Sequence, residues 1–396
     1  MRYSEKALRI APSATLEISA KAAQLRSEGF DVVGFGAGEP DYDTPEYIKE
    51  AAHDAISSGK TKYTAAAGIK ELREAVAARL KRRYGLEYDF KDIVISNGAK
   101  HSLFNAFQAT VNRGDEVIIA TPYWVTYPEL VRMADGVPVF VECAESNNFE
   151  PRIEDLKAAI TDKTKVILVT NPSNPCGCVY SRKSLEDIAA VAKEYDLHVI
   201  ADEIYDELVY DGDFVSFPTL SEDAKERTIL VNGMSKTYAM TGWRIGYTAS
   251  NGKAASVMSS YQSHASSNPN SIAQYASVAA LNGPQDDLAE MVAEYKLRRD
   301  LIVDLINSID GLSCRKPQGA FYALVNISAV KGKSIDGETV EGSMSFCDLL
   351  LRHKYVAAVP GLPFGADDYI RLSYATSRDV IEEGCRRIAE FIDMLK

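Results

Sequence analysis

The segment from Ser235 to Arg244 places an amine, a hydroxyl and a guanidinium close together in the chain. Lys236 has apolar and aromatic neighbours, a setting in which the pKa of a lysine can fall far enough for the neutral amine to attack a carbonyl group. Arg244 could hold a phosphate by two parallel hydrogen bonds, and Ser235 could add a hydroxyl donor. An isolated lysine is more often a surface side chain. The segment therefore permits carbonyl chemistry beside a phosphate without establishing it alone.

Two further segments could hold a charged ligand. Residues 96–100 (SNGAK) lie between a predicted strand and a predicted helix, so their free backbone N–H groups could bind a phosphate. The small residues Gly98 and Ala99 would let that backbone approach. Residues 202–205 (DEIY) follow another predicted strand. An ordinary strand-to-helix turn explains the first segment equally well, and a helix N-cap explains the second.

The elements that must position these residues follow a regular alternation. From about residue 92, short β-branched runs alternate with longer amphipathic stretches, which predicts repeated βα units and an α/β fold with a largely parallel sheet. The predicted strands are 93–95, 116–119, 166–169, 197–201, 228–231 and 244–247, with a crossover helix near 184–195. Ligands bind beyond the carboxyl ends of the strands in such sheets. We therefore expect the candidate residues to meet at that edge.

The pattern changes after Gly283-Pro284. A long charged helix is predicted at 285–307, followed by strands near 321–325 and 369–373. A chain of 396 residues exceeds the usual size of a single core, so we expect a second, α+β lobe here. The polar stretch 331–343 is predicted to be a mobile surface loop.

Composition argues against several kinds of partner. A formal charge of -12 disfavours attraction to nucleic acid or to anionic membranes. The apolar runs are far shorter than the roughly 18 to 20 residues of a membrane span, and the N-terminal residues do not resemble a secretory signal. We expect a cytosolic protein with no membrane or nucleic acid partner. Apart from Cys176-Gly177-Cys178 the cysteines are isolated, and the histidines are scattered, so we expect reduced thiols and no metal site.

Several of these features occur together in a recognisable order. The chain resembles the class I aminotransferases of pyridoxal-phosphate (PLP) fold type I, and among them the bacterial aspartate aminotransferases of subgroup Ib. The matching motifs are 12–15 (PSAT), 36–41 (GAGEPD), 235–236 (SK), 241–247 (TGWRIGY) and 371–375 (RLSYA). The resemblance implies a large PLP-binding domain at 46–286, whose mostly parallel central sheet lies between helices. It also implies a smaller α+β domain of 1–45 with 287–396, and a homodimer with shared active sites.

The resemblance further implies roles for individual residues. Lys236 matches the catalytic lysine that binds PLP covalently and moves a proton between the substrate and the cofactor. Asp202 matches the aspartate that keeps the pyridine nitrogen protonated, and Tyr205 matches a tyrosine that hydrogen-bonds the phenolic oxygen. Arg371 matches the arginine that holds the substrate α-carboxylate by a two-bond fork. The other implied contacts are Asn174 to the phenolic oxygen and the substrate, Gly38 to the substrate, Trp124 stacked on the ring, Gly98, Ala99, Lys100, Ser235 and Arg244 around the phosphate, and Tyr63 reaching the phosphate of the neighbouring subunit.

The implied substrates are less narrowly determined. In the subgroup, residues matching Lys100 and Thr15 meet the distal carboxylate, so we expect ping-pong transamination between aspartate and 2-oxoglutarate. A lysine can also lie along the wall of an apolar pocket, so aromatic or sulfur-containing amino acids, and carbon–sulfur β-lyase chemistry, are alternatives. A non-catalytic ligand-sensing module is an alternative of another class. Ala11 stands where relatives that accept prephenate have a basic residue, so we expect little prephenate activity, and Cys176 replaces a usual threonine.

Overall fold

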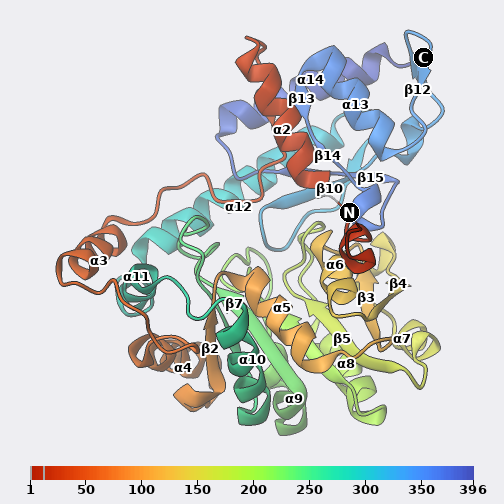
Figure 1. The fold of residues 1–396 in the computed structure, drawn as a ribbon. Coiled ribbons are helices and arrows are strands. Elements are labelled where there is room, and N and C mark those ends of the chain that lie inside the picture. The colour runs from red at the N-terminus through yellow and green to blue at the C-terminus, as the bar shows by residue number, and fades with distance from the viewer. Residues whose placement is uncertain (1, 12–13) are drawn as a thin grey trace.

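The computed structural model describes residues 2–11 and 14–396, and its centre is a seven-stranded sheet (Figure 1). The strand order is β2-β8-β7-β6-β5-β3-β4. Neighbouring strands from β4 to β7 are parallel, whereas β8 is antiparallel to both β2 and β7. The strands are β2 (Ile93–Ser96), β3 (Glu116–Thr121), β4 (Val137–Glu142), β5 (Thr164–Thr170), β6 (His198–Asp202), β7 (Thr228–Gly233) and β8 (Gly246–Ala249). The predicted α/β fold with a mostly parallel sheet is confirmed.

Two strands of this sheet differ from the sequence prediction. The strand predicted at 244–247 begins only at Gly246, because Arg244 has a left-handed backbone (φ 57°) that a strand does not accommodate. Strand β4 was not predicted at all. It contains Pro138 and lies at the edge of the sheet, where a residue without an N–H is tolerated.

Helices cover both faces of the sheet because successive apolar residues of each buried strand point to opposite sides. Ile118 and Ile167 belong to the cluster that includes α4 and α8, whereas Val117 and Val166 pack with α5 and α6. The helices of this part are α3 (Glu46–Ser57), α4 (Lys70–Tyr84), α5 (Ala99–Thr110), α6 (Thr126–Met133), α7 (Ile153–Ala159), α8 (Arg182–Glu194), α9 (Glu222–Arg227), α10 (Gly252–Ala265) and α11 (Ser271–Asn282). Within residues 2–11 and 14–396, none of the helices has the length and apolar character of a membrane span.

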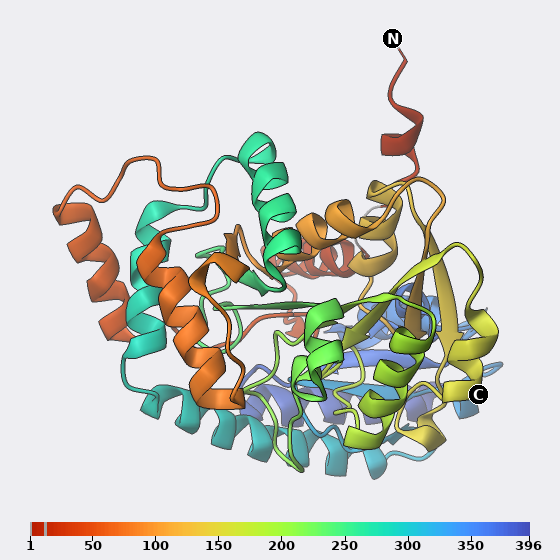
Figure 2. The ribbon, with the colours of Figure 1, turned by 90° about the horizontal axis from the view of Figure 1, so that it is seen from below.

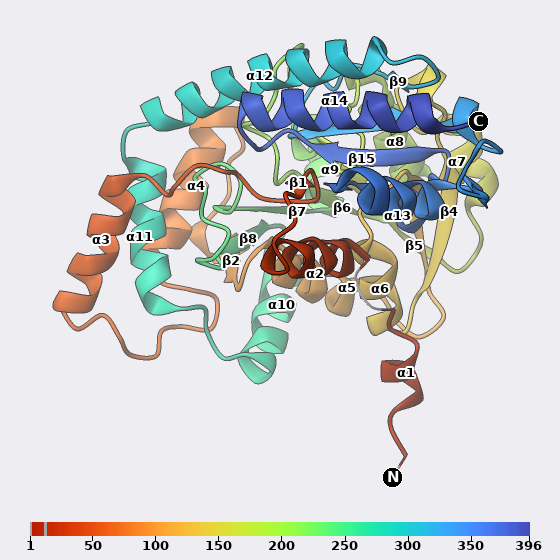
Figure 3. The same ribbon diagram turned by 90° about the horizontal axis from the view of Figure 1, so that it is seen from above.

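A second sheet, of four antiparallel strands in the order β14-β15-β10-β9, is formed by the C-terminal part of the chain. The long helices α12 and α14 lie side by side along it (Figure 3). Its elements are α12 (Asp286–Asn307), β9 (Ser313–Cys314), β10 (Tyr322–Asn326), α13 (Ser343–Lys354), β14 (Val359–Pro360), β15 (Tyr369–Ser373) and α14 (Arg378–Met394). The predicted helix at 285–307 and the strands near 321–325 and 369–373 are confirmed.

The polar stretch 331–343 is more ordered than the prediction of a mobile loop. It contains a short hairpin of β11 (Ser334–Ile335) and β12 (Glu338–Thr339). Ile335 and Val340 are buried in the C-terminal core, so the stretch is anchored by apolar contacts that its polar composition hides.

The N-terminal part supplies two helices and one strand. Helix α2 (Ala14–Ser27) leads to β1 (Val33–Gly34), which pairs in parallel with β13 (Val356–Ala357). Helix α1 (Glu5–Leu8) contacts α6, and the Lys6 amine donates to Asp135 at 2.9 Å, whereas the residues before α1 project away from the rest of the molecule (Figures 2 and 3). The first and last parts of the chain therefore meet beside the second sheet.

Candidate active site

The loops that follow five strands of the large sheet converge on one cavity of about 710 Å³. The parallel strands all end at the same edge, and the link from β7 to the antiparallel β8 folds over that edge as well. The predicted residues that line the cavity are Gly38, Ala99, Lys100, Trp124, Asn174, Asp202, Tyr205, Ser235, Lys236, Arg244 and Arg371. Residues that are far apart in the sequence thus form one site.

Three predicted residues are not part of this lining. Gly98 precedes α5 and lies behind Arg244, one layer from the cavity. Tyr63 lies in the link between α3 and α4, and 91% of its surface is exposed. Thr15 belongs to α2, but its side chain lies outside the part of the chain that the structure describes.

Lys236 lies in the cavity wall, where its amine donates a hydrogen bond to the Gly38 carbonyl. Burial lowers the pKa of Lys236 to about 8, and the positive charges of Arg244 and Arg371 act in the same direction. The carboxylate of Glu39 opposes this shift. A substantial fraction of the amine is therefore neutral near pH 8, which is the form that can attack a carbonyl.

Asp202, at the end of β6, is 3% exposed, and burial raises its pKa to about 6. The Tyr127 hydroxyl donates to Asp202 Oδ2 at 2.8 Å, and the Ile204 N–H donates to Oδ1 at 3.3 Å, so both oxygens are hydrogen-bonded. Thr170 in turn donates to the Tyr127 oxygen at 2.8 Å. A buried carboxylate held in this way favours pairing with a cationic N–H, because such a pair restores the stabilisation lost on burial.

Arg371 reaches the cavity from β15, and only 2% of the residue is exposed. Its Nη1 donates to Asn174 Oδ1 at 3.0 Å, and its Nη2 donates to the Gly36 carbonyl at 3.1 Å. Its Nε has no partner among the described residues. The ring of Tyr322 lies 4.4 Å from the guanidinium carbon. This is a buried cation with a spare donor, which fits a carboxylate ligand.

Tyr205 does not point freely into the cavity. Its hydroxyl is 2.8 Å from the hydroxyl of Tyr322, and burial raises the pKa of Tyr205 well above its usual value. Both hydroxyls are therefore protonated near neutral pH and can act as donors.

The link from β7 to β8 and the start of α5 together form a cradle of donors. The Arg244 Nη1 donates to the Thr241 carbonyl at 2.8 Å, and the guanidinium lies so close to Gly98 that a Cβ there would collide with it. A Cβ on Gly246 would likewise collide with the backbone of residues 98–99. Ser235 borders the same space. His101 and Ser102 donate their N–H groups to the Gly98 carbonyl, whereas the N–H groups of Ala99 and Lys100 have no acceptor among the described residues and could serve a phosphate.

Lys100 and Trp124 form a second wall. The Lys100 amine lies 4.7 Å from the ring centroid of Trp124, and Trp124 packs edge-on against Tyr127. Burial lowers the pKa of Lys100, with a smaller contribution from the charge of Arg244. Lys100 is thus a partly desolvated cation that borders the space beside Asp202 and Lys236.

Several residues of the site escaped the sequence analysis. They are Glu39, Tyr127, Thr170, Thr241 and Tyr322, all of which line the cavity. The Thr241 hydroxyl donates to Glu39 at 2.7 Å, which ties the N-terminal segment to the link that carries Lys236. Glu39 lies inside the motif 36–41, and Tyr322 lies inside a predicted strand. The sequence therefore indicated their place in the fold but not their contacts with the other residues of the site.

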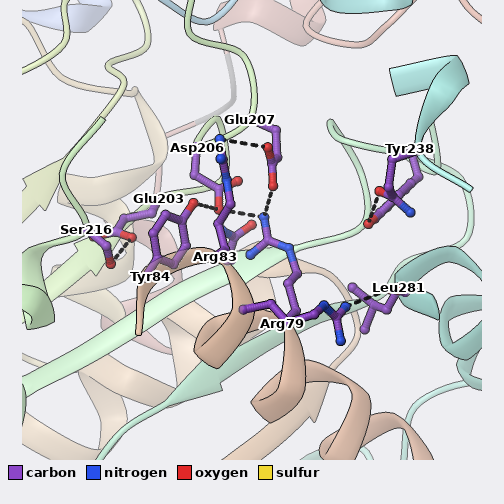
Figure 4. A network of polar contacts seen from close by, with 12 residues as sticks. Arg79, Arg83, Tyr84, Glu203, Asp206, Glu207, Ser216, Tyr238 and Leu281 are labelled. Carbon is purple, nitrogen blue, oxygen red and sulfur yellow. Dashed lines mark hydrogen bonds and ion pairs between the residues drawn. The ribbon is translucent and has the colours of Figure 1, made fainter. Parts of the chain in front are cut away.

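A buried charged network supports the segment that carries Asp202 and Tyr205 (Figure 4). From α4, Arg79 donates to Asp206 at 2.7 Å and to Glu207 at 2.8 Å, and Tyr84 donates to the same Asp206 oxygen at 2.7 Å. Glu203 accepts hydrogen bonds of 2.7 Å from the Ser216 hydroxyl and from the Phe217 N–H, and burial raises its pKa to about 8.

Known proteins similar to this chain indicate the class to which this sheet and cavity belong. The family model of the class I and II aminotransferases matches residues 31–388. The chain belongs to this family, and it is therefore an aminotransferase with the fold of that family.

Individual relatives cover almost the whole chain. An aspartate aminotransferase from Bacillus sp. (strain YM-2) is 45% identical over 97% of both chains. An aspartate/prephenate aminotransferase from Nitrosomonas europaea is 43% identical over 99% of this chain and 100% of its own. A solved structure of an aspartate aminotransferase from Thermus thermophilus with maleate has a TM-score of 0.93 at 42% identity, covering 99% of this chain and 100% of that chain.

Proposed function

We propose that the protein binds pyridoxal phosphate through Lys236 and exchanges amino groups between aspartate and 2-oxoglutarate by a ping-pong mechanism. The observation that carries the proposal is the convergence of three groups on one cavity: an amine with a pKa of about 8, a buried carboxylate and a buried guanidinium. Pyridoxal phosphate, when bound, would supply an aldehyde for the Lys236 amine and a protonated ring able to stabilise negative charge at the substrate Cα.

Each of these side chains has a distinct task in the proposal. Arg371 binds the α-carboxylate of the substrate through its spare donors and orients the Cα–H bond. Lys236 would accept the proton from Cα through its free amine, which its lowered pKa permits near neutral pH. Asp202 holds the ring nitrogen in its cationic form. Tyr205 donates a hydrogen bond to the phenolic oxygen, since its hydroxyl remains protonated.

The phosphate would lie in the cradle of Arg244, Ser235 and the first turn of α5. The combination of a fixed guanidinium, a hydroxyl and free helix N–H groups fits a dianion. Trp124 lines the same cavity and would supply an aromatic ring for stacking. The chain therefore has a complementary group for each polar end of the proposed cofactor.

The proposed substrate is a dicarboxylic acid because Lys100 provides a second cation in the cavity. The names of the relatives and the maleate-bound structure support the same choice. Thr15 is a second proposed contact for the distal carboxylate. The alternatives are transamination of aromatic or sulfur-containing amino acids and carbon–sulfur β-elimination, which use the same Lys, Asp and Arg groups.

Three further proposals concern the whole protein. The division into a domain of 46–286 and one of 1–45 with 287–396 is supported by the separation of the seven-stranded sheet from the four-stranded sheet. A homodimer with shared sites is supported by the almost fully exposed Tyr63 and by the residues before α1, which project from the molecule (Figure 2). A cytosolic location stays a prediction.

The direct test is Lys236→Ala. We expect this variant to bind pyridoxal phosphate without covalent attachment and to lose nearly all transaminase activity, because it lacks both the attacking amine and the proton acceptor. Borohydride treatment of the wild-type holoenzyme, followed by peptide mass spectrometry, should label Lys236. Retained activity in the variant, or a label on a different lysine, contradicts the proposal. Pyruvate and ammonia formed from cystathionine, without glutamate formed from aspartate and 2-oxoglutarate, would favour the lyase.

Substrate choice is tested by Lys100→Ala. Removal of a charge-assisted contact is expected to raise the KM for aspartate roughly 10- to 100-fold. Alanine and phenylalanine, which have no distal carboxylate, should be little affected. An equal rise of the KM for aspartate, alanine and phenylalanine would assign Lys100 to cofactor binding instead.

A further inference from the structure

Two thiols of the sequence take no part in the proposed reaction and lie against each other. Cys176 and Cys178 flank Gly177 in the loop after β5, and their sulfur atoms are 3.0 Å apart. The two residues are only 5% and 3% exposed. A shift of about 1 Å would bring the sulfurs to the roughly 2.0 Å of a disulfide bond.

The backbone of the loop holds the two thiols in this position. Gly177 has a left-handed backbone (φ 64°), and a Cβ there would lie 2.6 Å from Pro317 and 2.8 Å from the Gly319 carbonyl. The Gly177 carbonyl accepts hydrogen bonds of 2.9 Å from the N–H groups of Gln318 and Gly319. Glycine between the two cysteines is therefore required, and the turn that it makes places both side chains together.

The same loop carries a residue of the active site. Asn174 lies two residues before Cys176 and accepts the 3.0 Å hydrogen bond from Arg371. The Ser173 N–H donates to the Cys178 carbonyl at 3.0 Å, and the Gly177 N–H donates to the Ser173 carbonyl at 2.9 Å. The loop is closed on itself by these bonds, so a change at the two sulfurs is transmitted to Asn174.

We propose that Cys176 and Cys178 are a redox modification site, at which a peroxide converts the dithiol to a disulfide, displaces Asn174 and weakens binding of the substrate carboxylate. The effect on the substrate rests on the proposed function, whereas formation of the disulfide does not. In the first step a thiolate attacks one peroxide oxygen, and the other oxygen leaves as water after protonation. In the second step the other sulfur attacks the sulfenic acid, the S–S bond forms and a second water leaves. Two electrons pass from the dithiol to the peroxide, and a reducing dithiol reverses the change.

The immediate surroundings favour Cys176 as the attacking thiol. Burial alone would raise its pKa, but hydrogen bonds from Cys178, from Ser173 and from the backbone outweigh burial and lower it. Burial and the neighbouring Cys176 raise the pKa of Cys178 well above its usual value. The thiolate, which is the reactive form, is therefore favoured at Cys176 over Cys178.

The experiment uses the holoenzyme treated with hydrogen peroxide, alkylated with iodoacetamide and analysed by peptide mass spectrometry. We expect the peptide with Cys176 and Cys178 to lose two hydrogens and to resist alkylation until dithiothreitol is added. Binding of maleate, an unreactive dicarboxylate, is measured in parallel by calorimetry. Its dissociation constant should rise roughly 10- to 100-fold on oxidation, as expected for loss of a hydrogen bond to a charged group, and should return on reduction.

Variants separate this site from general oxidation. Cys176→Thr lacks the attacking thiol, so it should bind maleate as the reduced wild type does and should be insensitive to peroxide. Cys178→Ala should bind maleate in the same way before treatment, but peroxide should convert its Cys176 to sulfenic or sulfinic acid without a disulfide, and this mass measurement suffices if Cys176→Thr fails to fold. Cys314→Ser, which removes a buried thiol elsewhere, should stay as sensitive as the wild type. Absence of the disulfide overturns the proposal, as does unchanged maleate binding in a fully oxidised wild type. If Lys236 is not labelled by borohydride, the proposed function fails, while the mass measurement at Cys176 and Cys178 still decides the modification.

Discussion

Burial shifts the pKa values of the two central residues of the site, Lys236 and Asp202, in opposite directions. Burial disfavours the charged form of any side chain, so it lowers the pKa of Lys236 to about 8 and raises the pKa of Asp202 to about 6. Asp202 remains ionised at neutral pH because Tyr127 and the Ile204 backbone donate to its oxygens and because Lys236 is positively charged nearby. Lys236 can therefore act as a base beside the anionic Asp202 in the same water-poor cavity. Such shifted pKa values are typical of catalytic sites.

The lowered pKa of Lys236 predicts a specific pH dependence for attachment of pyridoxal phosphate to the cofactor-free protein. Below pH 8 the amine is increasingly protonated and cannot attack, so the rate should fall about tenfold per pH unit. Above pH 8 the amine is neutral and the rate should level off. Stopped-flow absorbance between pH 6 and pH 10 measures this profile. A rate that keeps rising to pH 10 would mean that the amine has the pKa of an exposed lysine.

The turn after β6 is the element on which the site depends most. Residues 202–207 carry Asp202 and Tyr205 toward the cavity, and on the other side Asp206 and Glu207 are tied to α4. Asp206 is fully buried, and Arg79 is 7% exposed, so their ion pair has little contact with water. Such a pair contributes little net stability, but loss of one partner leaves a buried charge without compensation.

Arg79→Met should therefore lower the free energy of unfolding by about 3 to 5 kcal/mol, because Asp206 and Glu207 lose their buried counter-charge. Urea unfolding followed by circular dichroism measures the change. The matched control is Arg152→Met, which breaks the exposed ion pair with Asp155 and should leave stability unchanged. An equal free energy of unfolding for Arg79→Met and Arg152→Met would show that water solvates the network around Arg79.

At the scale of the whole molecule, the site is assembled from almost the full length of the chain. Gly36 and Gly38 come from the N-terminal part, Asp202 and Lys236 from the large sheet, and Arg371 from the second sheet. Tyr63 lies outside this assembly and is 91% exposed, as expected for a residue that completes the site of a partner subunit. The proposed dimer would explain why the aromatic side chain of Tyr63 is left in solvent.

A mixing experiment tests the shared site. Lys236→Ala lacks the attacking amine, and Tyr63→Ala is expected to lose most of its cofactor affinity, so each homodimer should be impaired. In a mixed dimer of two-fold symmetry, one site would combine both defects and the other would be intact. Equal mixing after mild dissociation should therefore recover roughly a quarter of wild-type activity, since half of the dimers are mixed and half of their sites are intact. Recovery no greater than the sum of the two homodimers would place Tyr63 outside a shared site.

The sequence by itself determined the type of fold, most strands of the central sheet and the residues with reactive groups, because these depend on local periodicity and side-chain chemistry. It did not determine β4, since an edge strand with Pro138 lacks the pattern of a buried strand, or the hairpin within 331–343, which is anchored by the burial of Ile335 and Val340. Only the tertiary structure decided that Tyr127 bonds Asp202 and that Cys176 touches Cys178. Contacts across a fold and the pKa shifts caused by burial depend on distance in space, and distance along the chain does not specify them.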